Sequence, residues 1–466
     1  MAERPRQPAL LTDLYELTMA AAYFENHINA TASFELFIRS LPPARGYLLA
    51  AGLEQALDYL EDLRFTPAEI DFLRRQPVFA RVSPAFFDSL KELRFSGEVW
   101  AAPEGTPVFA EEPLVRVTAP IGEAQIVETF LLSTLTFQTM IATKAARVVE
   151  AAQGRGVVEF GTRRAHGPDA GVLAARAAFI GGCIGTSNVE AGRRFGIPTY
   201  GTLAHSFVMA YANEDQSFRD FERVFPEHAV LLVDTYDTLA AIEKIIWLGL
   251  RPKGVRLDSG DLVELSQAVR RRLDEAGLTD TKIFASGDLN EYAIQEALAR
   301  GATLDFFGVG TELATSKDAP ALSGVYKLVE LAPEGAAARE PHYRAKFSED
   351  KVSYPGRKQV FRFRDAQGFC DHDLIALAEE QPPGGEPLLA CVLRNGRRTA
   401  HPPPLAEIQE RARAELARLP TRYRQLQNPP AYPVRSSPAL TALLEKVRRQ
   451  VLQPTGKKNP ALKSGS

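Results

Sequence analysis

Short apolar runs alternate with amphipathic segments through the middle of the chain. The runs are rich in β-branched and aromatic residues, begin roughly 25 to 40 residues apart, and have a helical pattern in most intervals. This order is typical of βα units that build a parallel sheet. The predicted strands are 156–160, 197–203, 229–235, 254–259, 282–287 and 305–311.

One interval illustrates the helical pattern. Apolar residues at Leu262, Leu265, Ala268 and Leu273 share one face, the opposite face is charged, and Gly277 follows the expected end. Six such units favour a closed βα barrel, and an open doubly wound sheet is the alternative.

The two ends of the chain have a different pattern from the middle. Helices mix with proline-punctuated strands before the barrel, and proline-rich turns with one charged helix follow it. Neither end is large enough for an independent core, so we expect them to pack together as one α/β domain. The expected division is 1–130 and 346–450 for this second domain, 131–345 for the barrel, and 451–466 for a disordered tail.

Composition narrows the class of protein. The 466 residues are 45% hydrophobic and 24% charged, as in soluble globular proteins, and a net charge of -3 gives no general attraction to nucleic acid or anionic membranes. The three cysteines form no C-x-x-C pair, which fits a reducing cytoplasm. The N-terminus lacks the apolar core of a signal peptide, and the longest uncharged stretch, 130–143, is too short to span a bilayer. We expect that stretch to be the buried part of a long helix.

Polar residues follow most of the predicted barrel strands. Each alone has an ordinary explanation, because Asp at a strand end is often a helix N-cap and Arg is often a solvated surface group. In a βα barrel, however, the strand ends meet at one face. Together they predict a mixed-charge pocket for an anionic substrate and a divalent metal. These residues are Arg163, Arg164, His205, Asp234, Arg256, Asp258, Asp261 and Thr311.

Glycine-rich turns follow two successive predicted strands, at 286–288 and 308–311. Glycine lets backbone N–H groups approach a ligand closely, and a helix that starts there adds a favourable dipole. Neither turn has the spacing of a P-loop. As a pair, with Gly287, Gly308 and Gly310, they indicate a phosphate site.

Four motifs carry a family resemblance: "EFGTRRAHG", "GTLAHSF", "VRLDSGD" and "GVGT". With the opening "LLTDLYELTMAAAYFE" and the later "KFSEDKVSYPGRKQVFR", they resemble nicotinate phosphoribosyltransferase, of the type II phosphoribosyltransferase family. The resemblance implies an irregular α/β barrel with an α/β domain built from both chain ends. It also implies transfer of a phosphoribosyl group from 5-phosphoribosyl 1-diphosphate to nicotinate in NAD salvage, with ATP as co-substrate, Mg²⁺, and a cytoplasmic homodimer that shares its active sites.

The resemblance assigns roles to three residues of the catalytic centre. His205 matches the histidine that is phosphorylated when these ligase-type enzymes hydrolyse ATP, a task that suits the nucleophilic imidazole. Asp234 resembles the acid that orients this histidine. Asp258 resembles the acid that holds the ribose hydroxyls, and we expect it to lie close to the Mg²⁺ ion.

Other positions match the family's substrate contacts. Tyr15, from the partner subunit, and Phe160 would cover the two faces of the pyridine ring. Arg163, Thr202 and Arg256 match contacts to nicotinate. Thr311 matches a contact to the phosphoribosyl phosphate, and we expect Gly287, Gly308 and Gly310 of the two glycine-rich turns to bind the phosphoribosyl diphosphate with it.

Three alternatives stay open. Relatives that use nicotinamide carry an aspartate where this chain has Ser187, and a serine does not repel a carboxylate, so nicotinate is favoured. Quinolinate phosphoribosyltransferases share the barrel but are shorter and need a denser basic pocket. A barrel that only binds phosphorylated ligands would have no need for His205.

Overall fold

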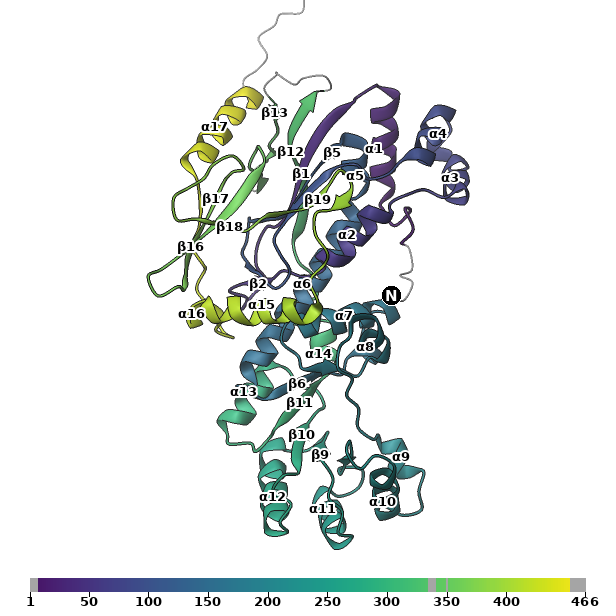
Figure 1. The fold of residues 1–466 in the computed structure, drawn as a ribbon, viewed down its shortest axis with the longest axis vertical. Coiled ribbons are helices and arrows are strands. Elements are labelled where there is room, and N and C mark those ends of the chain that lie inside the picture. Colours follow the sequence, from purple (N-terminus) through teal and green to yellow (C-terminus); the bar gives the residue numbers. More distant parts are fainter. Residues whose placement is uncertain (1–6, 334–340, 349–350, 453–466) are drawn as a thin grey trace, which may run out of the picture.

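A computed structural model describes residues 7–333, 341–348 and 351–452 of the chain. It has two parts, a mixed α/β domain and a βα barrel, joined by the long helix α6 (Glu128–Ala151) (Figure 1). As the uncharged stretch predicts, this helix is buried over much of its length, and it contributes to the hydrophobic cores of both parts.

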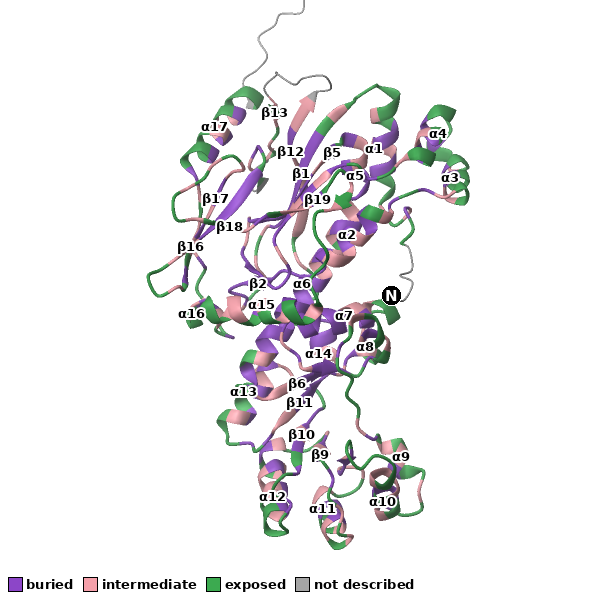
Figure 2. Ribbon diagram, viewed as in Figure 1, coloured by how far each residue is buried: buried purple, intermediate pink, exposed green. Residues whose placement is uncertain are grey.

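The barrel contains a six-stranded sheet in the order β7-β6-β11-β10-β9-β8, and all its strand pairs are parallel. It is an irregular α/β barrel, since its terminal strands β7 and β8 are not neighbours in this order. Buried valine, leucine, isoleucine and phenylalanine side chains of the strands meet the apolar faces of the helices in one core (Figure 2). The strands are β6 (Gly156–Glu159), β7 (Gly185–Thr186), β8 (Val230–Leu232), β9 (Gly254–Leu257), β10 (Lys282–Ala285) and β11 (Phe306–Val309).

Helices follow the barrel strands as the amphipathic intervals predict. The clearest of them, α12 (Leu262–Glu275), begins at an Asp261 side chain that caps its N-terminus and ends before Gly277 at φ +74°. The other helical elements of the barrel are η2 (Thr162–Arg164), α7 (Pro168–Ile180), α8 (Val189–Phe195), α9 (His205–Met209), α10 (Glu214–Val224), α11 (Thr238–Trp247), α13 (Glu291–Ala299) and α14 (Thr311–Ala314).

One predicted barrel strand is not formed. The run 197–203 makes only an isolated parallel bridge, between Thr186 and Thr199, and its place beside β6 is taken by the two-residue strand β7. Pro198 lacks the N–H group that a central strand needs, which explains why the apolar run does not pair further.

The second domain is built from both ends of the chain, as expected. Its seven-stranded sheet has the order β13-β12-β1-β5-β3-β19-β20, and a four-stranded sheet has the order β18-β16-β17-β21. The strands of these sheets are β1 (Ala30–Ile38), β3 (Glu98–Ala101), β5 (Pro113–Pro120), β12 (Gly324–Pro333), β13 (His342–Tyr343), β16 (Lys358–Arg364), β17 (Cys370–Leu377), β18 (Glu386–Pro387), β19 (Ala390–Arg394), β20 (Arg397–Arg398) and β21 (Val434–Ser436).

Short strand pairs and helices complete this domain. The pairs are β2 (Leu48–Leu49) with β4 (Pro107–Val108) and β14 (Phe347–Ser348) with β15 (Lys351–Val352). The helices are α1 (Leu14–Glu25), α2 (Leu53–Asp62), α3 (Pro67–Arg74), η1 (Pro77–Phe79), α4 (Pro84–Glu92), α5 (Ile121–Ile126), α15 (Leu405–Arg418), α16 (Thr421–Arg424) and α17 (Pro438–Leu452).

The sheet topology shifts the domain boundary that the sequence predicts at residue 345. Strand β12 already pairs antiparallel with β1 along its whole length, so the barrel ends before residue 324. The chain leaves the barrel after α14 and returns to the second domain in strand β12. The hydrophobic pattern of this strand alone does not show to which of the two sheets it belongs. The predicted tail lies outside the described residues from 453 onward.

Candidate active site

The guanidinium group of Arg256, in strand β9, joins several of the predicted residues. Its Nε donates to the Ser286 hydroxyl at 2.7 Å, Nη1 to the Thr202 hydroxyl at 2.8 Å, and Nη2 to Asp258 Oδ1 at 2.6 Å. The Phe160 ring lies 6.0 Å from the guanidinium carbon. Residues from four separate segments therefore meet at one face of the barrel, as the strand ends predict.

Asp258 is the acid at the centre of this group. Burial raises its pKa, but hydrogen bonds from Ser286 and Arg256 outweigh that effect, so that the pKa lies below the ordinary range. Both hydrogen bonds go to Oδ1. Oδ2 accepts none from the described residues and lies 4.0 Å from His205 Nε2. One carboxylate oxygen is thus fixed and the other is free for a ligand.

His205 is the first residue of α9, and its side chain is 44% exposed. Nδ1 lies 3.2 Å from the Thr235 hydroxyl, while Nε2 faces Asp258. The imidazole therefore points toward Asp258, with an edge open to solvent.

Asp234 lies beside the same group, but its hydrogen bonds do not involve the histidine. Its Oδ2 accepts from the Asp258 backbone N–H at 3.1 Å and from the Ser259 hydroxyl at 2.6 Å. Its Oδ1 is buried and accepts no hydrogen bond from any described residue. The neighbour that contacts His205 Nδ1 is Thr235, so the orienting role of Asp234 stays a prediction.

Phe160 follows β6, and its backbone N–H donates to the Val309 carbonyl at 2.8 Å. Its ring packs over Gly308, where a Cβ atom would come within 2.5 Å of the ring. Gly308 lies inside strand β11 and is buried, so its absent side chain makes room for Phe160. The phosphate contact predicted for Gly308 stays a prediction.

The two glycine turns lie at the ends of neighbouring strands, β10 and β11. Gly287 has φ +110°, and a Cβ there would come 2.8 Å from the Asp258 carbonyl oxygen, so only glycine fits this turn beside the acid. Gly310 precedes Thr311, the first residue of α14. Strands β10 and β11 pair directly, which places the turns side by side.

Two predicted nicotinate contacts form no hydrogen bond with the Arg256 group. Arg163 is exposed in η2 and makes no hydrogen bond or ion pair with the described residues. Tyr15 lies on α1 in the second domain, whereas His205 and α9 lie toward the far end of the barrel (Figure 1). Its side chain is 45% exposed, and partial burial together with the nearby charge of Glu128 raises the pKa of its hydroxyl.

Sequence reasoning missed two hydroxyl groups of the site, Ser286 and Thr235. Both lie at the ends of predicted strands, next to the predicted site residues Asp234 and Gly287. Their signal was the same strand-end position, but serine and threonine there are also common helix caps. Ser187, at the end of β7, is exposed.

Neither a metal cage nor a membrane segment is present in the described part of the chain. It contains no group of three or more His, Cys, Asp or Glu side chains arranged to hold a metal ion. Across residues 7–333, 341–348 and 351–452, every helix is too short or too polar to cross a lipid bilayer.

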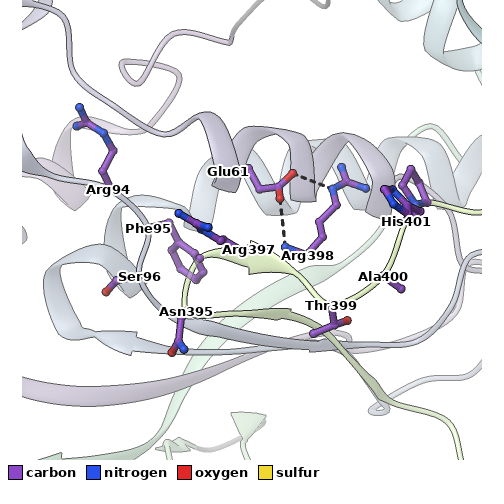
Figure 3. Close-up of a pocket in the computed structure, with 12 residues that line it drawn as sticks. Glu61, Arg94, Phe95, Ser96, Asn395, Arg397, Arg398, Thr399, Ala400 and His401 are labelled. Atoms are coloured by element: carbon purple, nitrogen blue, oxygen red, sulfur yellow. Dashed lines mark hydrogen bonds and ion pairs between the residues drawn. The ribbon is translucent and has the colours of Figure 1, made fainter. Parts of the chain in front are cut away.

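A cavity of about 890 Å³ lies elsewhere, in the second domain (Figure 3). It lies between α2, the loop at 94–96 and the β19–β20 hairpin with the chain that follows. Arg398 in its wall bonds to Glu61 and Glu54 on α2 at 2.8 and 3.0 Å. The predicted site residues do not line this cavity, and Arg398 in its wall holds the hairpin to α2.

Family comparisons cover most of the chain. Residues 10–136 match the nicotinate phosphoribosyltransferase N-terminal domain, 384–444 match its C-terminal domain, and 141–319 match the quinolinate phosphoribosyl transferase C-terminal domain. A nicotinate phosphoribosyltransferase of Mycobacterium tuberculosis is 47% identical over 456 residues, which is 96% of each chain. The chain belongs to the nicotinate phosphoribosyltransferase family.

Other relatives agree with this family. A nicotinate phosphoribosyltransferase of Bacillus subtilis is 40% identical and covers 91% of this chain and 92% of its own. The crystal structure of human nicotinic acid phosphoribosyltransferase superposes with a TM-score of 0.80 at 30% identity, covering 94% of this chain and 99% of its own. The structure of a nicotinate-nucleotide pyrophosphorylase from Pyrococcus furiosus gives 0.71 at 27% identity, covering 88% and 95%. The fold is therefore that of the type II phosphoribosyltransferases.

Proposed function

We propose that this chain joins nicotinate to 5-phosphoribosyl 1-diphosphate and forms nicotinate mononucleotide and diphosphate. The observation that carries the proposal is the Arg256 group at the barrel face. Of the five N–H groups of a guanidinium, three are used by Thr202, Ser286 and Asp258, which leaves two for a carboxylate. The names of the relatives support the same substrate.

The chemistry needs little from the protein beyond position and charge. Loss of diphosphate from ribose C1 builds positive charge on the sugar, as in glycoside cleavage. The pyridine nitrogen of nicotinate is already a nucleophile, so no strong general base is required. Phe160 supports one face of the ring, Arg256 and the unpartnered Arg163 supply positive charge for the carboxylate, and the ionised Asp258 holds the ribose hydroxyls.

Magnesium fits this site as a substrate-bound ion rather than as one caged by the protein. Mg²⁺ commonly binds through one or two carboxylates together with substrate phosphates, and it would neutralise charge on the diphosphate. Asp258 Oδ2 is the oxygen available for it.

ATP would act through His205. The imidazole would attack the γ-phosphate of ATP and release ADP, and the charge of Asp258, whose Oδ2 lies 4.0 Å from Nε2, would stabilise the cationic phosphoimidazolium that forms. Hydrolysis of the phosphohistidine would draw the overall reaction toward mononucleotide. The active form in this proposal is a cytoplasmic homodimer in which the partner subunit's Tyr15 covers the second face of the pyridine ring.

Replacement of His205 by alanine tests the coupling. We expect His205→Ala to abolish nicotinate-stimulated ADP release but to leave weak, uncoupled formation of mononucleotide, because the Arg256 group is intact. Mononucleotide and ADP are measured in the same assay. His228→Ala is the matched control, since His228 is exposed in the loop before β8. Undiminished ADP release by His205→Ala would refute the phosphohistidine.

Two rival substrates are tested with radiolabelled nicotinate, nicotinamide and quinolinate, each with and without ATP. Nicotinamide use is disfavoured because Ser187 offers no carboxylate to accept a hydrogen bond from the amide. Preferred turnover of nicotinamide or quinolinate would overturn the substrate assignment, and binding without turnover of any of the three would identify a non-catalytic barrel.

A further inference from the structure

A buried lysine lies behind the two glycine turns. Lys144, on helix α6, is 1% exposed, and its ammonium group lies 2.6 Å from Glu291 Oε2 and 2.8 Å from Asp318 Oδ1. A third carboxylate, Glu312 Oε2, lies at 3.9 Å. A buried ammonium is stable only with such partners, so its position depends on where these acids lie.

Two arginines extend this ionic group into the second domain. Arg147, one turn further along α6, bonds to Glu291 at 3.0 Å and to the backbone carbonyls of Ala44 and Leu426 at 2.6 and 3.0 Å. Arg45 holds Asp318 through two hydrogen bonds, at 2.9 and 3.0 Å. Lys317 pairs with Glu312 at 3.0 Å, so that four cations face three carboxylates, and the group, which we name the Lys144 network, spans both domains.

The acids of the Lys144 network belong to the helices that follow the two turns. Glu291 is the first residue of α13, which comes after β10 and the turn at Gly287. Glu312 is the second residue of α14, directly after Gly310 and Thr311. Asp318 follows α14 within a few residues. A single cation on α6 therefore contacts the chain just beyond both predicted phosphate turns.

We propose that Lys144 is a positioning residue for the phosphoribosyl diphosphate: its charge fixes the spacing of the turns at Gly287 and Gly310–Thr311. This inference rests on the proposed function, in which those turns bind the phosphates. The ammonium group is enclosed and does not reach the ligand itself. It acts through Glu291 at the start of α13 and through Asp318 just after α14, with a weaker pair to Glu312.

The main test compares two buried lysines. Lys358, in the second domain, is also buried and bonds to Glu35 at 2.8 Å, so Lys358→Met removes the same kind of pair away from the barrel. We expect Lys144→Met and Lys358→Met both to lower stability to urea. Only Lys144→Met should raise the Michaelis constant for 5-phosphoribosyl 1-diphosphate, by tenfold or more. Its Michaelis constant for nicotinate should stay within twofold of the wild-type value.

A second variant guards against failure of Lys144→Met to fold. Asp318→Asn is nearly isosteric, and the Asp318 side chain is 32% exposed, so folding should survive while one contact of Lys144 weakens. We expect a threefold or larger rise in the same Michaelis constant. An unchanged constant in the folded variants, relative to Lys358→Met, would overturn the proposal.

Binding of inorganic diphosphate, measured by calorimetry, separates this inference from the proposed reaction. If the wild-type protein binds diphosphate and Lys144→Met or Asp318→Asn weakens that binding, the positioning role stands even where nicotinate turnover fails. If the wild-type protein turns over nicotinate but the variants bind diphosphate as tightly as wild type, the positioning role is wrong and the proposed function survives. Absence of diphosphate binding to wild type would overturn the role of the turns.

Discussion

The Arg256 group and the Lys144 network use the same kinds of charge, but they leave different atoms open. In the Lys144 network, the Lys144 and Glu291 side chains are 1% and 0% exposed. In the Arg256 group, Arg256 and Asp258 are 13% and 27% exposed. Two guanidinium N–H groups and one carboxylate oxygen of that group have no partner among the described residues.

The difference separates a ligand site from a scaffold. A saturated buried network is costly to disturb and gains nothing from a ligand, because every charge is already compensated. An incompletely paired group that is partly exposed to solvent has both the polarity and the unpartnered hydrogen-bonding atoms to bind an anion. Burial and pairing, more than the presence of charge, therefore identify the site.

Arg256→Ala should give the largest effect on the open side of this comparison. Loss of a charge-assisted pair to the nicotinate carboxylate is expected to weaken binding by about 2–5 kcal/mol, which raises the nicotinate Michaelis constant by about 30-fold or more. Steady-state kinetics with each substrate varied in turn measures this change.

The control for Arg256→Ala is Arg272→Ala. Arg272 forms an exposed pair with Glu243 at 2.9 Å on the outside of the barrel, and such pairs contribute at most about 1 kcal/mol. Its Michaelis constants should stay within about twofold of wild type. An unchanged nicotinate constant in Arg256→Ala would remove Arg256 from the carboxylate site.

Gly308→Ala should give a smaller effect that reports on ring packing. The new Cβ would lie 2.5 Å from the Phe160 ring, so the ring must move. We expect a loss of about 1–3 kcal/mol in unfolding free energy and a severalfold rise in the nicotinate constant. Gly122→Ala is the control, because nothing lies within 4 Å of a Cβ there. A nicotinate constant that matches that of Gly122→Ala would place Phe160 outside the ring site.

The sequence predicted the open group better than the closed network. Residues such as Asp258 and Arg256 stand at the ends of apolar runs, and the barrel topology brings strand ends together whatever the details of pairing. The partners of each atom could not be predicted, because they depend on rotamers. For this reason the sequence did not predict that the neighbour of His205 Nδ1 is the Thr235 hydroxyl.

Lys144 shows the limit of pattern reading. It follows the uncharged stretch 130–143 directly, so the pattern suggests a helix that becomes polar, whereas α6 stays buried through Arg147 and Val148. Only acids more than a hundred residues away, such as Glu291, explain a cation there. The predicted domain boundary at residue 345 differs from the structure for a similar reason, because β12 pairs with β1, a strand far away in the sequence.

Acid titration should give the smallest effect and test the closed side. Burial raises the pKa of Asp318, but the hydrogen bonds and positive charges of Arg45 and Lys144 outweigh that effect. The pKa therefore lies well below the ordinary range. A depressed carboxyl stabilises the fold above its unfolded pKa of about 3.9 and loses that contribution as the pH falls. Wild type should therefore exceed Asp318→Asn in unfolding free energy by about 1–2 kcal/mol near pH 7. In urea titrations, this difference should shrink below about pH 4; a constant difference would show that the Asp318 charge does not hold the Lys144 network.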